Sequence, residues 1–259
     1  VTTIDPAFGG NDTISTGLND DLIMGGTAND TISTTGGNNI ILGDNGRAVF
    51  GADGTLLTVE ATNPTLGGND NIATAGGNDL VIAGTADDTV RAGSGQDLIF
   101  GDHGQISGSI RLTQLPLNTF SPDFMFTSIA TQSADLGGND FILAGAGEDI
   151  IVGGQGRDRI HGEAGDDDII GGHSVADGHD DQDLIDGGEG HDYIAGDNAV
   201  IRREPRTTDT RWRAIVGAQL LGVDGQGSVT NTPQTDPSSV NKRTMTLFNH
   251  TSTTDSLYF

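Results

Sequence analysis

Aspartate recurs at nine-residue intervals through three stretches of this 259-residue chain, and an Ile or Val stands two residues after each recurrence. The clearest units read GGQGRDRIH (153–161) and GGEGHDYIA (187–195). Carboxylates are hard oxygen ligands that suit divalent cations such as Ca²⁺, and their regular spacing favours ligation over acid–base catalysis. The positions in register are Asp12, Asp21, Asp30, Asn39, Asp70, Asp79, Asp88, Asp97, Asp140, Asp149, Asp158, Asp167, Asp183 and Asp192.

Each nine-residue unit predicts a turn followed by a short strand. The glycine-rich half before the Asp is turn chemistry, because glycine tolerates positive φ. The half after it is a three-residue strand whose central Ile or Val points inward. Two units then form one coil, so Asp12 stacks beside Asp30 on one edge and Asp21 beside Asn39 on the other. Stacked carboxylates repel unless a cation lies between them, and the turns direct main-chain carbonyls to the same place.

The composition requires such a cation if the chain is to fold. Only 34% of the residues are hydrophobic, the formal net charge is -25, and there are no cysteines. Low hydrophobicity with high net charge otherwise predicts disorder. The same charge makes nucleic acid and membrane surfaces poor partners, and the sequence holds no apolar run long enough to insert into a membrane.

This pattern resembles the RTX (hemolysin-type calcium-binding) repeat, GGxGxDxUx, of secreted bacterial proteins. The resemblance covers residues 9–43, 67–101 and 137–196. It implies an all-β fold, a calcium-loaded parallel β-roll (a β-solenoid) with several Ca²⁺ ions held between Asp carboxylates and turn carbonyls. It also implies export by a type I secretion system and folding by calcium outside the cell. Because Asn39 is neutral and Asn19 replaces a turn glycine, sites near them are expected to be weak or empty.

A longer period interrupts the repeats. The phrases LGDNG (42–46), FGDHG (100–104) and AGDNA (195–199) end successive blocks, and we expect Asp44, Asp102 and Asp197 to close the last calcium site of each block. The alternative is an Asx turn that starts a hairpin, and both can hold. Residues 47–66 and 105–136 predict protruding β-hairpins.

We therefore expect one elongated body divided into five segments. They are the tail of a preceding hairpin at 1–8, a block with its hairpin at 9–66, a block with a longer hairpin at 67–136, a third block at 137–198, and a β-rich, hairpin-type extension at 199–259. The sequence begins and ends at the same point of this longer repeat, which indicates that the chain is a piece of a larger repeat protein.

Two side-chain groups allow a second interpretation. His161, His173, His179 and His191 predict either polar loop residues, which we favour, or a transition-metal site. Arg202, Arg203, Arg206, Arg211 and Arg213 flank Trp212. They predict a hairpin that leans on the acidic roll, with a ligand-binding surface as the alternative.

Three functions from different classes follow. We favour a calcium-stiffened structural or adhesive module of a large extracellular bacterial protein, whose partners are calcium, neighbouring repeats of the same parent chain and a cell surface or matrix. The alternative is the C-terminal folding and secretion tail of a type I-secreted hydrolase or toxin. An ice-binding array is disfavoured, because only Thr27 and Thr85 match its turn threonine. No hydrolase, zinc-protease or phosphate-loop motif is present, so we expect no enzyme.

Overall fold

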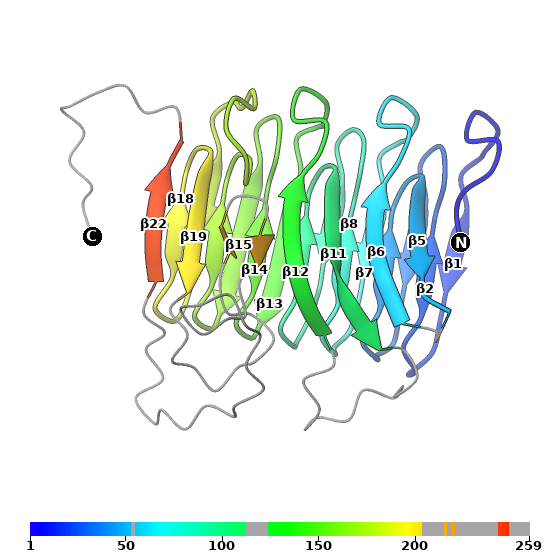
Figure 1. Cartoon of the computed structure of the whole chain (residues 1–259), viewed down its shortest axis with the longest axis horizontal. Helices are drawn as coiled ribbons and strands as arrows, with labels where there is room; N and C mark the ends of the chain where they lie inside the picture. Colours follow the sequence, from blue (N-terminus) through cyan, green and yellow to red (C-terminus); the bar gives the residue numbers. More distant parts are fainter. Residues whose placement is uncertain (53–54, 112–123, 204–214, 217–218, 221–242, 249–259) are drawn as a thin grey trace.

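The chain is built from strands and turns. The computed structural model describes residues 1–52, 55–111, 124–203, 215–216, 219–220 and 243–248. Within these residues there is no helix, and hence none that is long and apolar enough to cross a membrane. Figure 1 shows the short strands succeeding one another along the long axis of the molecule.

Two parallel seven-stranded sheets form the roll, and successive repeats alternate between them. The exposed sheet has the order β1-β3-β7-β9-β13-β15-β17, and the covered sheet has the order β2-β4-β8-β10-β14-β16-β18. The exposed sheet comprises Thr13–Ser15, Thr31–Ser33, Asn71–Ala73, Thr89–Arg91, Phe141–Ala146, Arg159–Ala164 and Leu184–Asp186. The covered sheet comprises Leu22–Met24, Ile40–Leu42, Leu80–Ile82, Leu98–Phe100, Ile150–Val152, Asp168–Ile170 and Tyr193–Ala195.

The repeated Ile and Val residues stack in register between the sheets. Ile14 pairs with Ile32 in the exposed sheet, and Ile23 pairs with Ile41 in the covered sheet. These central side chains form one buried cluster along the roll. The predicted parallel β-roll is thus confirmed, since each aliphatic residue covers the one in the next coil.

The roll continues across both hairpin insertions. Strand β3 pairs with β7 and β4 with β8 across the first insertion, and β9 pairs with β13 and β10 with β14 across the second. The insertions therefore leave the roll as loops and return to the next coil without breaking either sheet.

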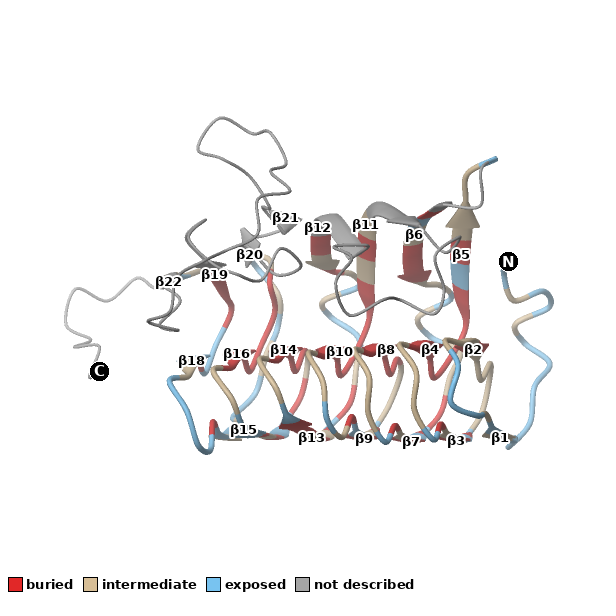
Figure 2. Cartoon of the chain, turned by 90° about the horizontal axis from the view of Figure 1, so that it is seen from below, coloured by how far each residue is buried: buried red, intermediate tan, exposed pale blue. Residues whose placement is uncertain are grey.

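The hairpins join to form a third layer. Strands β5 (Gly46–Phe50), β6 (Thr55–Ala61), β11 (Gly104–Arg111) and β12 (Phe124–Thr131) form an antiparallel sheet in the order β12-β11-β6-β5. Because β6 pairs with β11, hairpins from two different blocks are joined. Figure 2 shows this hairpin sheet above the covered sheet.

The hairpin sheet buries a second core that the repeat pattern alone did not indicate. Leu80, Ile82 and Phe100 flank the central residues of their strands, face out of the roll and pack against hairpin residues such as Val59 and Ile106. The corresponding residues of the exposed sheet are mostly polar, as in the sequence TIS of β1 and β3. The central Ile or Val is thus the only one facing into the roll, but all three residues of β4, β8, β10, β14 and β16 are buried.

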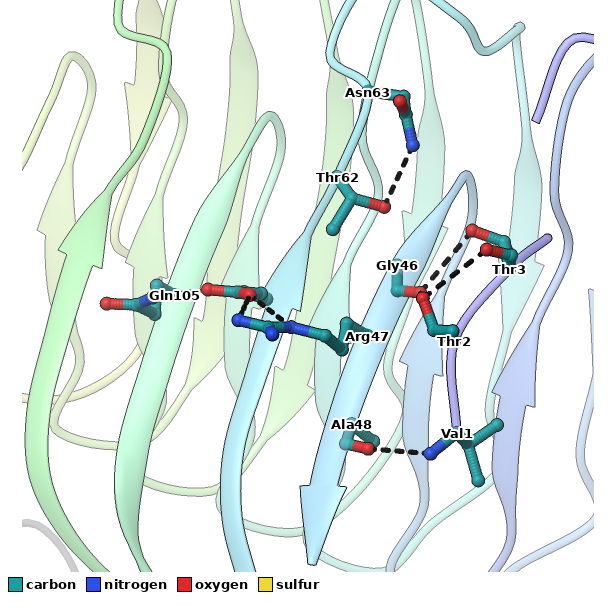
Figure 3. Close-up of polar contacts among 10 residues, drawn as sticks. Val1, Thr2, Thr3, Gly46, Arg47, Ala48, Thr62, Asn63 and Gln105 are labelled. Atoms are coloured by element: carbon teal, nitrogen blue, oxygen red, sulfur yellow. Dashed lines mark hydrogen bonds and ion pairs between the residues drawn. The ribbon is translucent and has the colours of Figure 1, made fainter. Parts of the chain in front are cut away.

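The N-terminal residues extend the edge of the hairpin sheet. Thr2 bridges antiparallel to Arg47, and the amino group of Val1 donates to the carbonyl of Ala48 (Figure 3). Arg47 Nε donates to Glu60 Oε1 over 2.6 Å, and Gln105 donates to the other oxygen of Glu60. Glu60 therefore links neighbouring strands of this layer.

The C-terminal extension adds two small antiparallel pairs. Strand β19 (Ala199–Arg203) pairs with β22 (Arg243–Leu247), and β20 (Ile215–Val216) pairs with β21 (Gln219–Leu220). Ala199 and Ile201 pack against Ile170 and Ala195 at the end of the covered sheet. The interpretations placed on Arg206, Arg211, Trp212 and Arg213 fall outside the described residues, and Arg202 and Arg203 are described only as residues of a strand.

Candidate metal sites along the edges of the roll

The repeat aspartates form two stacks, one along each edge of the roll. The first edge consists of the turns that lead into the exposed sheet, and the second edge of the turns that lead into the covered sheet. The first edge carries Asp12, Asp30, Asp70, Asp88, Asp140, Asp158 and Asp183. The second carries Asp21, Asn39, Asp79, Asp97, Asp149, Asp167 and Asp192. The structure thus brings together, coil by coil, the residues that the nine-residue register predicts.

One side-chain oxygen of each stacked residue holds the next coil in place. The main-chain N–H of Asp12 donates to Asp30 Oδ1 over 2.7 Å, and that of Asp158 donates to Asp183 Oδ1 over 2.9 Å. The ladder crosses the first hairpin, because Asp30 N–H donates over 2.7 Å to Oδ1 of Asp70, 40 residues later. The second edge repeats this geometry with distances of 2.7 to 3.1 Å.

The other oxygen on the first edge is buried without a hydrogen-bond donor. This applies to Oδ2 of Asp30, Asp70, Asp88, Asp140, Asp158 and Asp183. The first five of these residues are each only 2% exposed. A buried carboxylate oxygen that lacks a partner is costly, and a row of them also accumulates negative charge. The first edge therefore requires positive charge or protons at Oδ2.

The pKa values of these carboxyl groups are raised, which shows that the charged form is disfavoured at these positions. Burial raises the pKa of Asp70 to about 8 and that of Asp140 to about 8. The pKa of Asp158 rises to about 9, first because of burial and next because of the charge of Asp140. Burial likewise raises the pKa of Asp183 to about 6. Both causes disfavour the charged form, which a bound cation would stabilise.

Beside four turn glycines, the Oδ2 atoms of Asp30, Asp70, Asp140 and Asp158 converge with a main-chain carbonyl oxygen of the next coil. A Cβ built on Gly25, Gly43, Gly101 or Gly153 would lie no more than 2.5 Å from Oδ2 of the Asp in its own turn and from a main-chain carbonyl oxygen of the next coil. Carboxylate and carbonyl oxygens that converge on one point are the ligands Ca²⁺ prefers. The first-edge Asp residues and the carbonyls of Gly43, Ala83, Gly153 and Gly171 would therefore hold the ion.

Main-chain oxygens are a necessary part of these ligand sets. Among the described residues, no three His, Asp or Glu side chains gather closely enough to hold a metal ion by themselves. The stacked turns therefore offer mixed sites of carboxylates and carbonyls, in agreement with a hard cation and in contrast to zinc.

Asp44 and Asp102 occupy a different place from the stacked residues. Asp44 Oδ1 accepts the N–H of Gly68 over 3.0 Å, and its Oδ2 accepts the N–H of Thr85 over 2.5 Å. Asp102 accepts the N–H groups of Gly138 and Gln155 in the same way. Each of these two carboxylates lies where a hairpin begins. It accepts one N–H from the residue where the chain returns to the roll and one N–H from the next coil. Burial raises the pKa of Asp44 to about 7 and also raises that of Asp102.

At the third block, Asp180 lies beside the turn glycine Gly172. A Cβ built on Gly172 would lie close to Asp180 Oδ2 and 2.5 Å from Asn198 Oδ1, just as one on Gly84 would meet Asp44. Asp180 Oδ2 is buried without a donor. Burial first raises the pKa of both Asp180 and Asp183, and the charge of the exposed Asp197 adds to the rise, so Asp197 stands near these two carboxylates at the last coil. The nine-residue register misses Asp180 because the residue lies in the extra loop.

A second ladder of hydrogen bonds runs through residues that directly precede the stacked Asp residues. The nine-residue register does not predict this ladder. Asn11 Oδ1 accepts the N–H of Asn29 over 3.2 Å, and Asn29 Oδ1 accepts that of Asn69 over 2.9 Å. This ladder runs in the opposite direction to the Asp ladder, so neighbouring coils hold each other reciprocally. The recurring ND dipeptide is the sequence signal that could have revealed it.

The four histidines do not converge on one site. His161 lies 3.9 Å from Asp186, His179 lies 2.8 Å from Asp135, and His191 lies 3.5 Å from Asp166. His173 is buried and its Nε2 lies 2.7 Å from the carbonyl of His179. These separate contacts disfavour a transition-metal site. The prediction of polar loop residues fits His179 and His191, which are exposed, whereas His161 lies in strand β15 and His173 is buried.

Comparison with known families gives one result. A family model described as RTX calcium-binding nonapeptide repeat (4 copies) matches residues 7–23, 16–48, 65–99, 135–160, 143–173 and 171–198. Searches of curated proteins and of solved structures find no match. The matched residues cover both edges of the roll and leave out most of the two hairpins and the C-terminal extension.

Proposed function

Because this chain belongs to the family of RTX calcium-binding nonapeptide repeats, we propose that it is a calcium-dependent, stiff structural or adhesive module of a large extracellular bacterial protein. The observation that carries the proposal is the row of buried, donor-free Oδ2 atoms along the first edge, most of which converge with a main-chain carbonyl oxygen of the next coil beside a turn glycine. Such a row is stable only when cations or protons neutralise it, and calcium outside the cell would do so.

The residues of the chain explain why folding would depend on the ion. With a net charge of -25 and a thin supply of apolar residues, the chain resists compaction. Bound calcium supplies positive charge between neighbouring coils, and its binding free energy becomes folding free energy. Asp158 Oδ1 meanwhile keeps the coils in register through the N–H of Asp140. The chain would stay unfolded at low cytosolic calcium, which suits type I secretion.

Stiffness follows from the three-layered arrangement. The covered sheet is packed on both faces, and the pairing of β6 with β11 ties the first block to the second. A body that cannot bend between blocks suits a spacer that holds an adhesive surface away from a cell. We propose no catalytic role for it.

Circular dichroism during a calcium titration, with magnesium as the control, tests this function. We expect a cooperative change from coil to β signal with calcium alone, and small-angle scattering should report a rod in calcium and an expanded chain in chelator. A chain that is equally folded and equally rod-like in chelator would contradict the proposal.

A further inference from the structure

Two arginines flank a phenylalanine on the outer face of the exposed sheet. Strands β9, β13 and β15 are neighbours in this sheet, which lies on the side of the roll opposite the hairpin sheet (Figure 2). Phe141 begins β13 and pairs with Thr89 of β9 and with Arg159 of β15. Its side chain faces out of the roll, because the next residue, Ile142, packs in the core. The guanidinium carbon of Arg91 lies 5.7 Å from the centre of the Phe141 ring, and that of Arg159 lies 5.6 Å from it.

Further contacts hold both guanidinium groups in place. Arg159 Nε donates to His161 Nε2 over 3.1 Å, and the rings of His161 and Phe141 meet edge-to-face with their centres 6.1 Å apart. Arg91 Nη1 donates to Asn71 Oδ1 over 3.2 Å. The negative face of an aromatic ring also attracts a guanidinium group. The two positive charges are therefore oriented by the protein itself.

The two arginines lack the partners that are most abundant in this chain. The sequence has 37 Asp and Glu residues against 12 Lys and Arg residues. Even so, no carboxylate among the described residues lies within ion-pairing distance of Arg91 or Arg159. Asp186 lies beside this group of residues, 3.9 Å from His161 Nδ1. Because both arginines are exposed, an anion from outside the protein can reach them.

The shape of this face favours a sugar chain over a peptide as the anion. Strands β9, β13 and β15 are each paired on both sides, so they offer no open edge to which a peptide strand could add. The row that leads across the sheet to Phe141 carries the amide of Asn71 and the hydroxyl of Thr89. These groups can bind sugar hydroxyls, and the planar guanidinium groups suit two-point hydrogen bonds to carboxylates.

We propose that the outer face of β9, β13 and β15 binds an acidic polysaccharide, whose carboxylates pair with Arg91 and Arg159 while Phe141 and His161 position the two guanidinium groups. This inference rests on the proposed adhesive role, to which it gives a surface and a partner.

The high negative charge of the chain makes this binding depend on calcium. The outer face exists only in the folded roll, and bound calcium reduces the charge that repels a polyanion. Charges further away than about 8 Å are largely screened in physiological salt, so the arginines dominate at the face itself.

Calorimetric titration of the full chain in saturating calcium tests the inference, with hyaluronan and galacturonate oligosaccharides as the probes. Arg157 and Arg159 are matched, because both are exposed and lie two residues apart, but Arg157 belongs to the turn before β15. Arg159→Gln and Arg91→Gln should each raise the Kd by about fivefold or more, because a charge-assisted hydrogen bond is lost. Arg157→Gln should change the Kd by less than about twofold. Phe141→Leu should also raise the Kd.

Several outcomes would overturn the inference. Equal Kd values for Arg157→Gln and Arg159→Gln would do so, as would wild-type binding of dextran or polyglutamate as tight as that of the acidic sugars. Circular dichroism checks that each variant folds in calcium, and if Arg159→Gln does not fold, Arg91→Gln decides in its place. A chain that folds with calcium but binds neither acidic sugar overturns this inference alone, whereas a chain equally folded in chelator contradicts the proposed function.

Discussion

Each buried aspartate of the first edge has two tasks, one for each carboxylate oxygen. Oδ1 accepts a main-chain N–H from the neighbouring coil, as Asp158 Oδ1 does from Asp140 over 2.8 Å. Oδ2 has no donor among the described residues and converges with the carbonyl oxygen of Gly171 beside Gly153. The two tasks can be separated, because asparagine retains an oxygen for the ladder and removes the charge.

Replacing Asp158 by asparagine should therefore weaken calcium binding more than it disturbs the fold. We expect the calcium concentration at the folding midpoint to rise by about tenfold or more and the transition to become less cooperative, because a charged ligand is lost. Calorimetric titration measures both. The exposed Glu189 is the control, and an equal effect of Glu189→Gln would refute the assignment.

Protonation offers a second way to relieve the first edge. Burial raises the pKa values of Asp70 and Asp140 to about 8 and that of Asp158 to about 9, whereas all three would ionise near 3.8 in an unfolded chain. Between pH 4 and 9 the metal-free folded chain thus binds more protons than the unfolded one, and its stability falls as the pH rises.

In chelator, where the chain is largely unfolded, its β signal in circular dichroism should accordingly be stronger at pH 5 than at pH 8. In saturating calcium the free energy of unfolding should instead be lower at pH 5 than at pH 8, because protons compete with the ion for the same oxygens. Circular dichroism in chelator and urea denaturation in calcium, each at both pH values, measure these two dependences. The same pH dependence in both media would show that the buried carboxylates do not exchange protons for calcium.

At the scale of the strand, the residues on either side of the central Ile or Val decide which sheet is covered, because they are apolar in one sheet and mostly polar in the other. Strands β4 and β8 read IIL and LVI, whereas β3 and β7 read TIS and NIA. The flanking residues of the first pair bury apolar surface under the hairpins, and those of the second pair mostly face water. The hairpin sheet is therefore specified by residues of the roll as well as by its own strands.

Leu80 and Asn71 occupy the same repeat position on the two sheets and allow a direct comparison. Leu80 is fully buried against the hairpin layer, whereas Asn71 is exposed. Leu80→Ala should cost about 2 to 5 kcal/mol of unfolding free energy in saturating calcium, because it leaves a cavity. Asn71→Ala should change it by less than about 0.5 kcal/mol. Chemical denaturation measures both, and similar costs would show that the second core contributes little.

The sequence predicts the elements well where the repeat is regular. The spacing of Asp30 and Ile32 predicts both the turn and the strand, because each nine-residue unit carries its own turn glycines and its own core residue. It does not predict the pairing of β6 with β11, which depends on two insertions meeting in space. Nor does it predict that Asp180 faces Gly172, since that residue lies in a loop outside the register.

At the scale of the whole molecule, each coil touches mainly its two neighbours. Strand β8 pairs with β4 and β10, and the ladders likewise join adjacent coils. Stability in such a body is approximately a sum of coil and interface contributions, so the ends are its weakest points. Residues of the end coils are also more exposed to solvent than those in the middle. Asp12 is exposed and Ile194 is 40% exposed, whereas Ile99 in the middle is fully buried.

Calcium withdrawal should accordingly open the roll from its ends. Hydrogen exchange measured by mass spectrometry across a series of free calcium concentrations should show residues 13–24 and 184–195 losing protection at higher calcium than residues 80–100. The central coils are held by neighbours on both sides and by the hairpin sheet, so they should exchange last. Simultaneous loss of protection along the whole chain would mean that the hairpin layer makes the three blocks one cooperative unit. Earlier loss in the centre would contradict the continuous ladder across the insertions, at Asp30 to Asp70 and at Asp88 to Asp140.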